Sequence, residues 1–153
     1  MPGYRGHLIG GVVAFTLLSL LHRAPFSLIG QTELLFITCL GALFPDIDTK
    51  SRGQRYFYSL LAILFIILFL HHQFIIISLL AVAAIVPLVV AHRGPFHNPK
   101  IICFIVILCI LVILCTFSIR LRSVSWHGLY FFIGSLSHLF LDYGIKRFFK
   151  KLF

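Results

Sequence analysis

Apolar runs separated by short polar breaks extend over the whole chain. Six runs can be delimited, at residues 8–21, 34–45, 57–70, 74–91, 101–119 and 128–142, and all 13 Lys and Arg residues lie outside them. Runs as apolar as these must be helical in lipid, because a helix satisfies every backbone N–H and C=O group within one segment. The pattern therefore predicts an all-α, multi-pass transmembrane helical bundle of about six apolar helices.

The first two runs, 8–21 and 34–45, are shorter than the roughly 20 residues that a full crossing needs. They are expected either to be extended by neighbouring residues or to be re-entrant. The N-terminus has the basic start and apolar run of a signal peptide, but no convincing small-residue cleavage site follows, so a retained first helix is predicted. The whole chain, 1–153, is predicted to be one integral-membrane domain, because no hydrophilic stretch is long enough to fold separately.

The chain ends in a basic amphipathic tail, residues 143–153, in which cations alternate with bulky apolar side chains in YGIKRFFKKLF. This pattern is typical of a short helix that lies on an anionic membrane surface. It is equally typical of a simple basic stop signal after the last span. The sequence leaves both interpretations open.

The composition confirms the membrane class and excludes two others. Hydrophobic residues make up 60% of the chain, the mean hydropathy is +1.06, and only 11% of residues are charged, against about 25% in soluble domains. The net charge of +9 does not indicate nucleic-acid binding, because the basic residues stand in ones and twos at the ends of apolar runs. The four cysteines lie within apolar runs without a CxxC pair, so neither a zinc ribbon nor a disulfide framework is expected: Cys39, Cys103, Cys109 and Cys115.

The distribution of Lys and Arg predicts the orientation. If each run is a crossing or a re-entrant pair of half-crossings, ten of these residues fall on one side and three on the other. The rich side carries Arg5, Lys50, Arg52, Arg55, Arg93, Lys100, Lys146, Arg147, Lys150 and Lys151, and the poor side Arg23, Arg120 and Arg122. By the positive-inside rule, both termini are cytoplasmic in a cell (inner) membrane.

Three of the four acidic residues lie at the ends of apolar runs on the predicted cytoplasmic side. Asp46 and Asp48 form FPDID after the second run, and Asp142 closes SHLFLD in the sixth. Ionisable groups at membrane depth are costly and are therefore functional candidates. His138 stands four residues before Asp142, which places both side chains on one face of a helix.

Further histidines join these acids on the same side: His7 before the first run, and His92 and His97 after the fourth. Imidazole and carboxylate together suit Zn²⁺, Mn²⁺ or Fe²⁺, and a catalytic metal keeps a coordination position open to water. Each motif alone has an ordinary explanation, such as a helix end for PDID or a loop that meets lipid headgroups through Arg93. Their joint occurrence on one membrane face predicts a metal centre.

The opposite side has histidines but only one acid, Glu33. These histidines are interpreted as interfacial residues whose polar tips reach water: His22, His71, His72 and His127. No ligand pattern connects them, and a turn explains the adjacent pair.

In their order along the chain, GHL, FPDID, HRGPFHN and SHLFLD resemble the YdjM-like family of small multi-pass proteins, known as predicted membrane-bound metal-dependent hydrolases. The resemblance covers nearly the whole chain. It implies a polar site of His7, Asp46, Asp48, His92, His97, His138 and Asp142. Where that family usually has HRGxTHS, this chain has Phe96 and Asn98 in place of Thr and Ser. The family is also distantly similar to zinc-dependent phospholipase C, which implies a hydrolytic reaction.

A membrane-bound hydrolase is therefore the predicted function, with a metal-activated water attacking a phosphoester or lipid-linked substrate at the cytoplasmic face. The expected metal ligands are His7, Asp46, His92, His97, His138 and Asp142, and the expected catalytic residues are Asp46, Asp48 and Arg93. Arg93 would contact a phosphate oxygen through its planar guanidinium. Zinc is the expected metal, with manganese, iron or magnesium as alternatives. The expected partners are membrane lipids with anionic headgroups.

Two other functions remain open from the sequence. One is a non-catalytic membrane protein with a structural metal, because ligand types look alike in open and closed sites. The other is an ion transporter, which would need polar residues in mid-helix. Runs 57–70 and 101–119 offer almost none.

Overall fold

The computed structural model describes residues 3–22, 27–47, 52–70, 72, 74, 77–78, 81, 84–85, 95–116 and 121–152. The elements along the chain are α1 (Tyr4–His22), α2 (Leu28–Leu43), η1 (Phe44–Asp46), α3 (Arg52–Leu70), η2 (Pro95–His97), α5 (Pro99–Thr116) and α6 (Leu121–Leu152). These described ranges contain helices and no strand, which confirms the all-α class. Most of the predicted fourth run, 74–91, lies outside the described residues.

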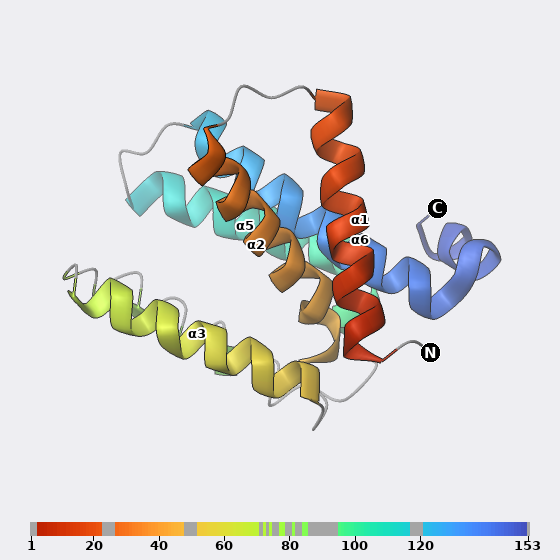
Figure 1. Ribbon diagram of the computed structural model, residues 1–153, viewed down its shortest axis with the longest axis horizontal. Coiled ribbons are helices and arrows are strands. Elements are labelled where there is room, and N and C mark those ends of the chain that lie inside the picture. The colour runs from red at the N-terminus through yellow and green to blue at the C-terminus, as the bar shows by residue number, and fades with distance from the viewer. Residues whose placement is uncertain are drawn as a thin grey trace.

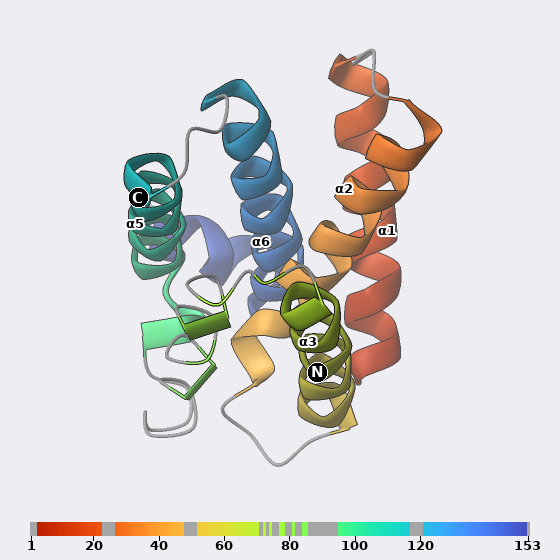
Figure 2. The same ribbon diagram turned by 90° about the vertical axis from the view of Figure 1, so that its left-hand side faces the viewer.

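Helix α6 is the centre of the arrangement. Figure 2 shows it between α5 on one side and α1 and α2 on the other. Helix α1 runs antiparallel to α6: the Ser19 and Tyr130 hydroxyls are 3.2 Å apart near one end, and His7 approaches Asp142 near the other. Helix α2 runs in the same direction as α6, so the end of α2 and the later part of α6 meet where α1 begins (Figure 1).

Small residues allow α2 and α6 to approach closely. A Cβ atom added to Gly134 would overlap the Thr38 carbonyl oxygen, and one added to Gly41 would overlap the Phe131 backbone. The buried Ser135 hydroxyl donates a hydrogen bond of 3.1 Å to the Gly41 carbonyl across the same interface. Close backbone contact of this kind is typical of helices that associate in lipid. The hydrophobic effect does not favour their association there, because lipid tails are as apolar as the side chains.

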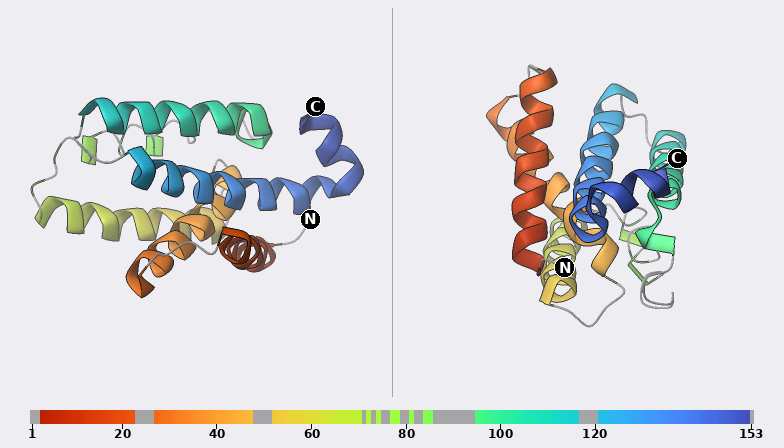
Figure 3. Two further views of the ribbon diagram at one scale, coloured as in Figure 1. Left: turned by 90° about the horizontal axis from the view of Figure 1, so that it is seen from above. Right: turned by 90° about the vertical axis from the view of Figure 1, so that its right-hand side faces the viewer.

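A break at Gly144 turns the end of α6. Its φ of 65° and ψ of 169° interrupt the helix in a conformation that favours glycine. The segment that follows departs from the axis of α6 (Figure 3). Phe148 in this segment is buried in a cluster with Ile102 of α5 and Leu139 of α6. The predicted basic tail is thus helical after Gly144 and packs one aromatic side chain into the bundle; its contact with a membrane surface stays a prediction.

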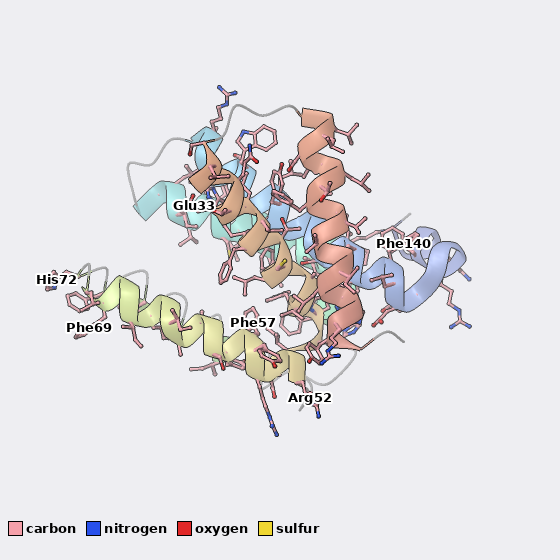
Figure 4. The ribbon with its side chains drawn as sticks, viewed as in Figure 1. Glu33, Arg52, Phe57, Phe69, His72 and Phe140 are labelled. Atoms are coloured by element: carbon pink, nitrogen blue, oxygen red, sulfur yellow. The ribbon has the colours of Figure 1, made fainter. Side chains whose placement is uncertain are left out.

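Helix α3 begins near the start of α1 and extends away from it. Figure 4 shows Arg52 and Phe57 at the near end, and Phe69 and His72 at the far end. The Tyr58 hydroxyl donates a hydrogen bond of 2.7 Å to the Ala84 carbonyl, which brings Ala84 of the fourth run close to the first half of α3. His72 has a φ of 55° after the end of α3, in line with the turn expected there.

The two short apolar runs belong to longer helices. Helix α1 has 19 residues and α2 has 16, because both begin before their apolar runs do. Among the described residues, Tyr4–Leu21 is the one helical stretch that meets the criterion of length and apolarity for crossing a membrane; Pro99–Cys115 is apolar but shorter. The six-span topology remains a proposal.

Candidate metal centre

Four predicted site residues meet where the ends of several elements converge. Asp46 ends η1, His97 ends η2, and His138 and Asp142 lie one turn apart on α6. Each offers one ligand atom, and these four atoms all lie within 4.8 Å of one another. Residues that are up to 96 positions apart along the chain thus form one cluster.

The distances within the cluster suit a shared cation. His138 Nε2 lies 3.4 Å from Asp142 Oδ2 and 3.5 Å from Asp46 Oδ1, and His97 Nε2 lies 3.7 and 3.9 Å from Asp46 Oδ1 and Asp142 Oδ2. Such separations exceed an ordinary N–H···O bond of roughly 2.7–3.2 Å. They approach the roughly 3.4 Å between two ligands placed tetrahedrally at zinc bond lengths. The cluster is therefore a candidate metal site.

A backbone contact orients His138. Its Nδ1 is 2.8 Å from the buried Ala42 carbonyl oxygen, which can only accept, so Nδ1 carries the proton and donates it. In the neutral ring, Nε2 then presents its lone pair toward the two carboxylates. Within the described residues, the buried His138 Nε2 and Asp142 Oδ1 have no hydrogen-bond partner. A cation would satisfy such a nitrogen, and a hydrogen bond from the second ring nitrogen to a carbonyl is typical of a metal-ligating histidine.

Asp46 is the most exposed of the four residues in the cluster. Its side chain is 31% exposed, whereas those of His97, His138 and Asp142 are at most 5% exposed. Burial raises the pKa of the Asp46 carboxyl, but when no metal is bound and His138 and His97 are protonated, these two histidines lower it by more, so this pKa lies well below its usual range. Asp46 therefore remains an anion at neutral pH and forms the open side of the cluster.

His7 lies against the cluster without belonging to the group of four. Its ring stacks on that of His138 with centroids 3.7 Å apart, and its Nε2 is 3.5 Å from Asp142 Oδ1. Asp142 thus faces His138 and His97 with one oxygen and His7 with the other. The structure brings His7 to the site, and its role as a ligand stays a prediction.

Three predicted site residues, Asp48, His92 and Arg93, lie outside the described residues. Phe96, which stands where the resemblance leads one to expect a hydroxyl, is 3% exposed and packs edge-on against Phe44 with ring centroids 5.4 Å apart. At this position the chain therefore uses aromatic packing to fix the segment that carries the adjacent His97.

The family described as YdjM inner membrane protein matches residues 1–149. The chain belongs to this family. Neither the curated proteins nor the solved structures gave a match. The inner-membrane character of the YdjM family agrees with the composition, and the match spans the whole of the candidate metal centre.

Sequence reasoning missed two residues that support the centre in this YdjM-family chain. The Tyr143 hydroxyl donates a hydrogen bond of 3.0 Å to the His97 carbonyl, and Ala42 holds His138 through its backbone. The position of Tyr143 directly after Asp142 was a usable signal. A backbone carbonyl carries no such signal, because every residue has one.

An ion pair at the opposite end of α6 was also missed. His127 Nε2 lies 3.9 Å from Glu33 Oε2, and both side chains are more than a third exposed. An exposed pair of this kind contributes little to stability. It provides a control site near the other end of α6, the helix that carries His138 and Asp142.

The Tyr143→Phe variant is expected to bind zinc about tenfold more weakly than wild type while it keeps its fold. The change removes only the hydroxyl that fixes the His97 backbone. Zinc titration against a competing chelator in detergent measures the affinity. The matched control is Tyr130→Phe, which removes the hydroxyl facing Ser19 and should bind zinc as wild type does. Equal affinity in all three proteins would contradict a role for Tyr143.

Proposed function

We propose that this protein is a membrane-bound, metal-dependent hydrolase that acts on a phosphoester at the cytoplasmic face of the membrane. The observation that carries the proposal is His138 Nε2, which is buried, oriented through the Ala42 carbonyl and directed at two carboxylates. The proposed metal is zinc, because two imidazoles and two carboxylates match its usual nitrogen and oxygen ligands; manganese and iron fit the same set.

Each residue has a proposed part in the reaction. A bound divalent ion would lower the pKa of a water molecule and polarise a phosphoryl oxygen. The exposed side of Asp46 would be where water and substrate enter. His7 would hold the outer oxygen of Asp142 and so keep its other oxygen directed at the cluster. Asp48 would act as a general base and Arg93 would contact the phosphate, since Asp48 stands two residues after Asp46 and Arg93 stands between His92 and His97 in the sequence.

The charge at the two ends of the bundle supports the cytoplasmic placement. Around the site end, described cationic side chains are exposed on α1, α3, α5 and the last part of α6: Arg5, Arg52, Arg55, Lys100, Arg147 and Lys150. At the opposite end, Arg122 is the corresponding exposed cation among the described side chains. By the positive-inside rule, this asymmetry supports a site in the cytoplasmic half of the membrane, where cations would also attract an anionic substrate.

One observation favours a second function, a structural metal clip. Four protein ligands are enough to fill a tetrahedral zinc site, whereas a catalytic zinc usually has three and a water. A clip would hold α2, α5 and α6 together without turnover. The two functions differ in one measurable property, which is hydrolysis.

Activity in detergent on phosphomonoester, phosphodiester and phospholipid substrates tests the hydrolase. We expect hydrolysis that a chelator abolishes and zinc restores, and an Asp46→Asn variant that is slower by at least about 100-fold, because Asp46 is a proposed ligand. The control, Glu33→Gln, removes a carboxylate in α2 at the opposite end of the bundle from the site and should leave the rate unchanged. Zinc-loaded protein that hydrolyses none of the three substrate classes would favour the clip.

A further inference from the structure

An apolar groove of about 600 Å³ runs between α1 and α6. Helix α1 contributes Gly6, Gly10, Val13 and Leu17 to its lining, at the spacing of one helix face, and α6 contributes Leu136 and Phe140. Phe140 is exposed on this side of α6 (Figure 4). Ser137 is the one residue with a polar side chain among the described residues that line the groove. A long apolar channel of this kind is complementary to hydrocarbon.

One end of the groove lies beside the metal centre. Its lining residues Gly6 and Leu141 directly adjoin His7 and Asp142 in the sequence. A Cβ atom added to Gly10 would lie 2.7 Å from Leu141 Cδ1, so α1 and α6 are in contact at this end. The two helices that form the groove are therefore the two that bring His7 Nε2 to 3.5 Å from Asp142 Oδ1.

The size of the groove fits one hydrocarbon chain better than a helix. From Gly6 to Leu21 it extends roughly 22 Å along α1, which exceeds the roughly 15 Å thickness of one hydrocarbon leaflet. Its volume lies in the roughly 300–1,000 Å³ range of small-molecule pockets. A second helix of this length and 10 Å diameter would occupy roughly 1,700 Å³. A second copy of the chain could therefore not seat a helix within the groove.

Positive charge marks the end of the groove near the site. Arg5 precedes the lining residue Gly6, and Arg147 precedes the lining residue Phe148; both arginine side chains are exposed. A lipid whose chain lay in the groove would have its headgroup at this end. A phosphate there would meet cations on both sides.

We infer that the groove binds one acyl chain of an anionic phospholipid of the cytoplasmic leaflet and thereby brings the phosphoester of that lipid to the metal centre. The identity of this lipid as the substrate rests on the proposed hydrolase function. Binding of the acyl chain does not rest on the hydrolase function, because it depends only on the shape and apolarity of the groove.

Photo-crosslinking in vesicles tests the inference. The protein is reconstituted in phosphatidylcholine vesicles that contain phosphatidic acid with a diazirine near the end of one acyl chain, with chelator present, and labelled residues are mapped by mass spectrometry. In wild type, labels should concentrate on the groove face of α1 and on α6. Ala14→Phe, which places an aromatic ring in the groove, should reduce this labelling about tenfold.

Two variants make the comparison specific. Val12→Phe adds the same ring on an exposed part of α1 outside the groove lining and should leave the labelling unchanged. Leu17→Trp narrows the groove at a residue that is 58% exposed, where a larger side chain does not disturb the fold, and should reduce the labelling as Ala14→Phe does.

The outcomes separate this inference from the proposed function. Labels spread evenly over the exposed faces of α1, undiminished labelling in both groove variants, or crosslinks between two copies through the groove would each overturn the acyl-chain site. Labelling of the groove without hydrolysis of any substrate would contradict the proposed hydrolase function and would still support the acyl-chain binding site. Phospholipid hydrolysis at the wild-type rate in both groove variants would overturn the inference that the groove brings the lipid substrate to the metal centre, and would leave the hydrolase standing.

Discussion

The His138→Ala variant is expected to bind zinc at least about 100-fold more weakly than wild type, because loss of a ligand should exceed the 10–100-fold effect of losing a residue that only supports one. His138 is fully buried, and its Nε2 lies 3.4 and 3.5 Å from oxygens of Asp142 and Asp46. Alanine removes this nitrogen, so that Asp46, Asp142 and His97 are the three ligands that remain for the cation. Titration of the metal-free protein with zinc against a competing chelator measures the change.

The control for this prediction lies on the same helix. His127 is about three turns earlier on α6, pairs with Glu33 at 3.9 Å, and is 37% exposed. His127→Ala should bind zinc as wild type does. His138→Gln preserves most of the buried volume and separates loss of the ligand from the cost of a cavity. If His138→Ala and His138→Gln both kept the wild-type affinity, His138 would not be a ligand.

The Gly134→Ala variant is expected to be destabilised by about 3 kcal/mol, the upper part of the usual range for overpacking. In an ordinary helix position this substitution is stabilising by about 0.5–1 kcal/mol, so the sign of the effect is diagnostic. A Cβ here would overlap the Thr38 carbonyl oxygen, and backbone cannot rotate aside as a side chain can. The α2–α6 interface would have to open, which would also move the Ala42 carbonyl that holds His138.

Reversible unfolding in mixed detergent micelles measures the change in stability. Gly128→Ala is the matched control on α6, because its Cβ would meet only side-chain atoms of Ile110 and Val106, which can adjust. This control should lose much less stability than Gly134→Ala, and it should retain zinc affinity. Gly134→Ala as stable as wild type would contradict the close backbone crossing of α2 and α6.

The helical class and the convergence of the site follow from patterns that the sequence displays directly. Apolar runs without charges specify helices in lipid whatever their neighbours are. The spacing of His138 and Asp142 fixes a shared helix face. Charge counting placed His7, Asp46 and His97 at the same end of the molecule as this pair, and the structure brings all five together there.

The direct support of the cluster could not be predicted in the same way. The hydrogen bond to His138 comes from the backbone of Ala42, and its position depends on how closely α2 crosses α6. That crossing depends on the close contact of Gly41 and Gly134 with the backbone of the opposite helix. Such a contact involves both helices, so the sequence of one helix alone does not predict it.

The packing of the segment after Gly144 against the bundle is a second feature that sequence patterns do not predict. Alternation of cations with Phe and Leu describes a helix with two faces, but it does not identify what the apolar face contacts. In the structure, Phe148 packs against Phe140 with ring centroids 5.5 Å apart because Gly144 breaks the helix between them. A single glycine with a positive φ, Gly144, thus determines the direction of the C-terminal helical segment.

The metal content of the purified wild-type protein, loaded with zinc and freed of excess ion by gel filtration, tests the central claim most directly. Elemental analysis should find about one tightly bound zinc per chain, because the four ligand atoms surround one position. A protonated His138 paired with Asp46 and Asp142 would explain the same distances without any metal. Folded protein with no retained zinc, manganese or iron after loading would therefore contradict the account.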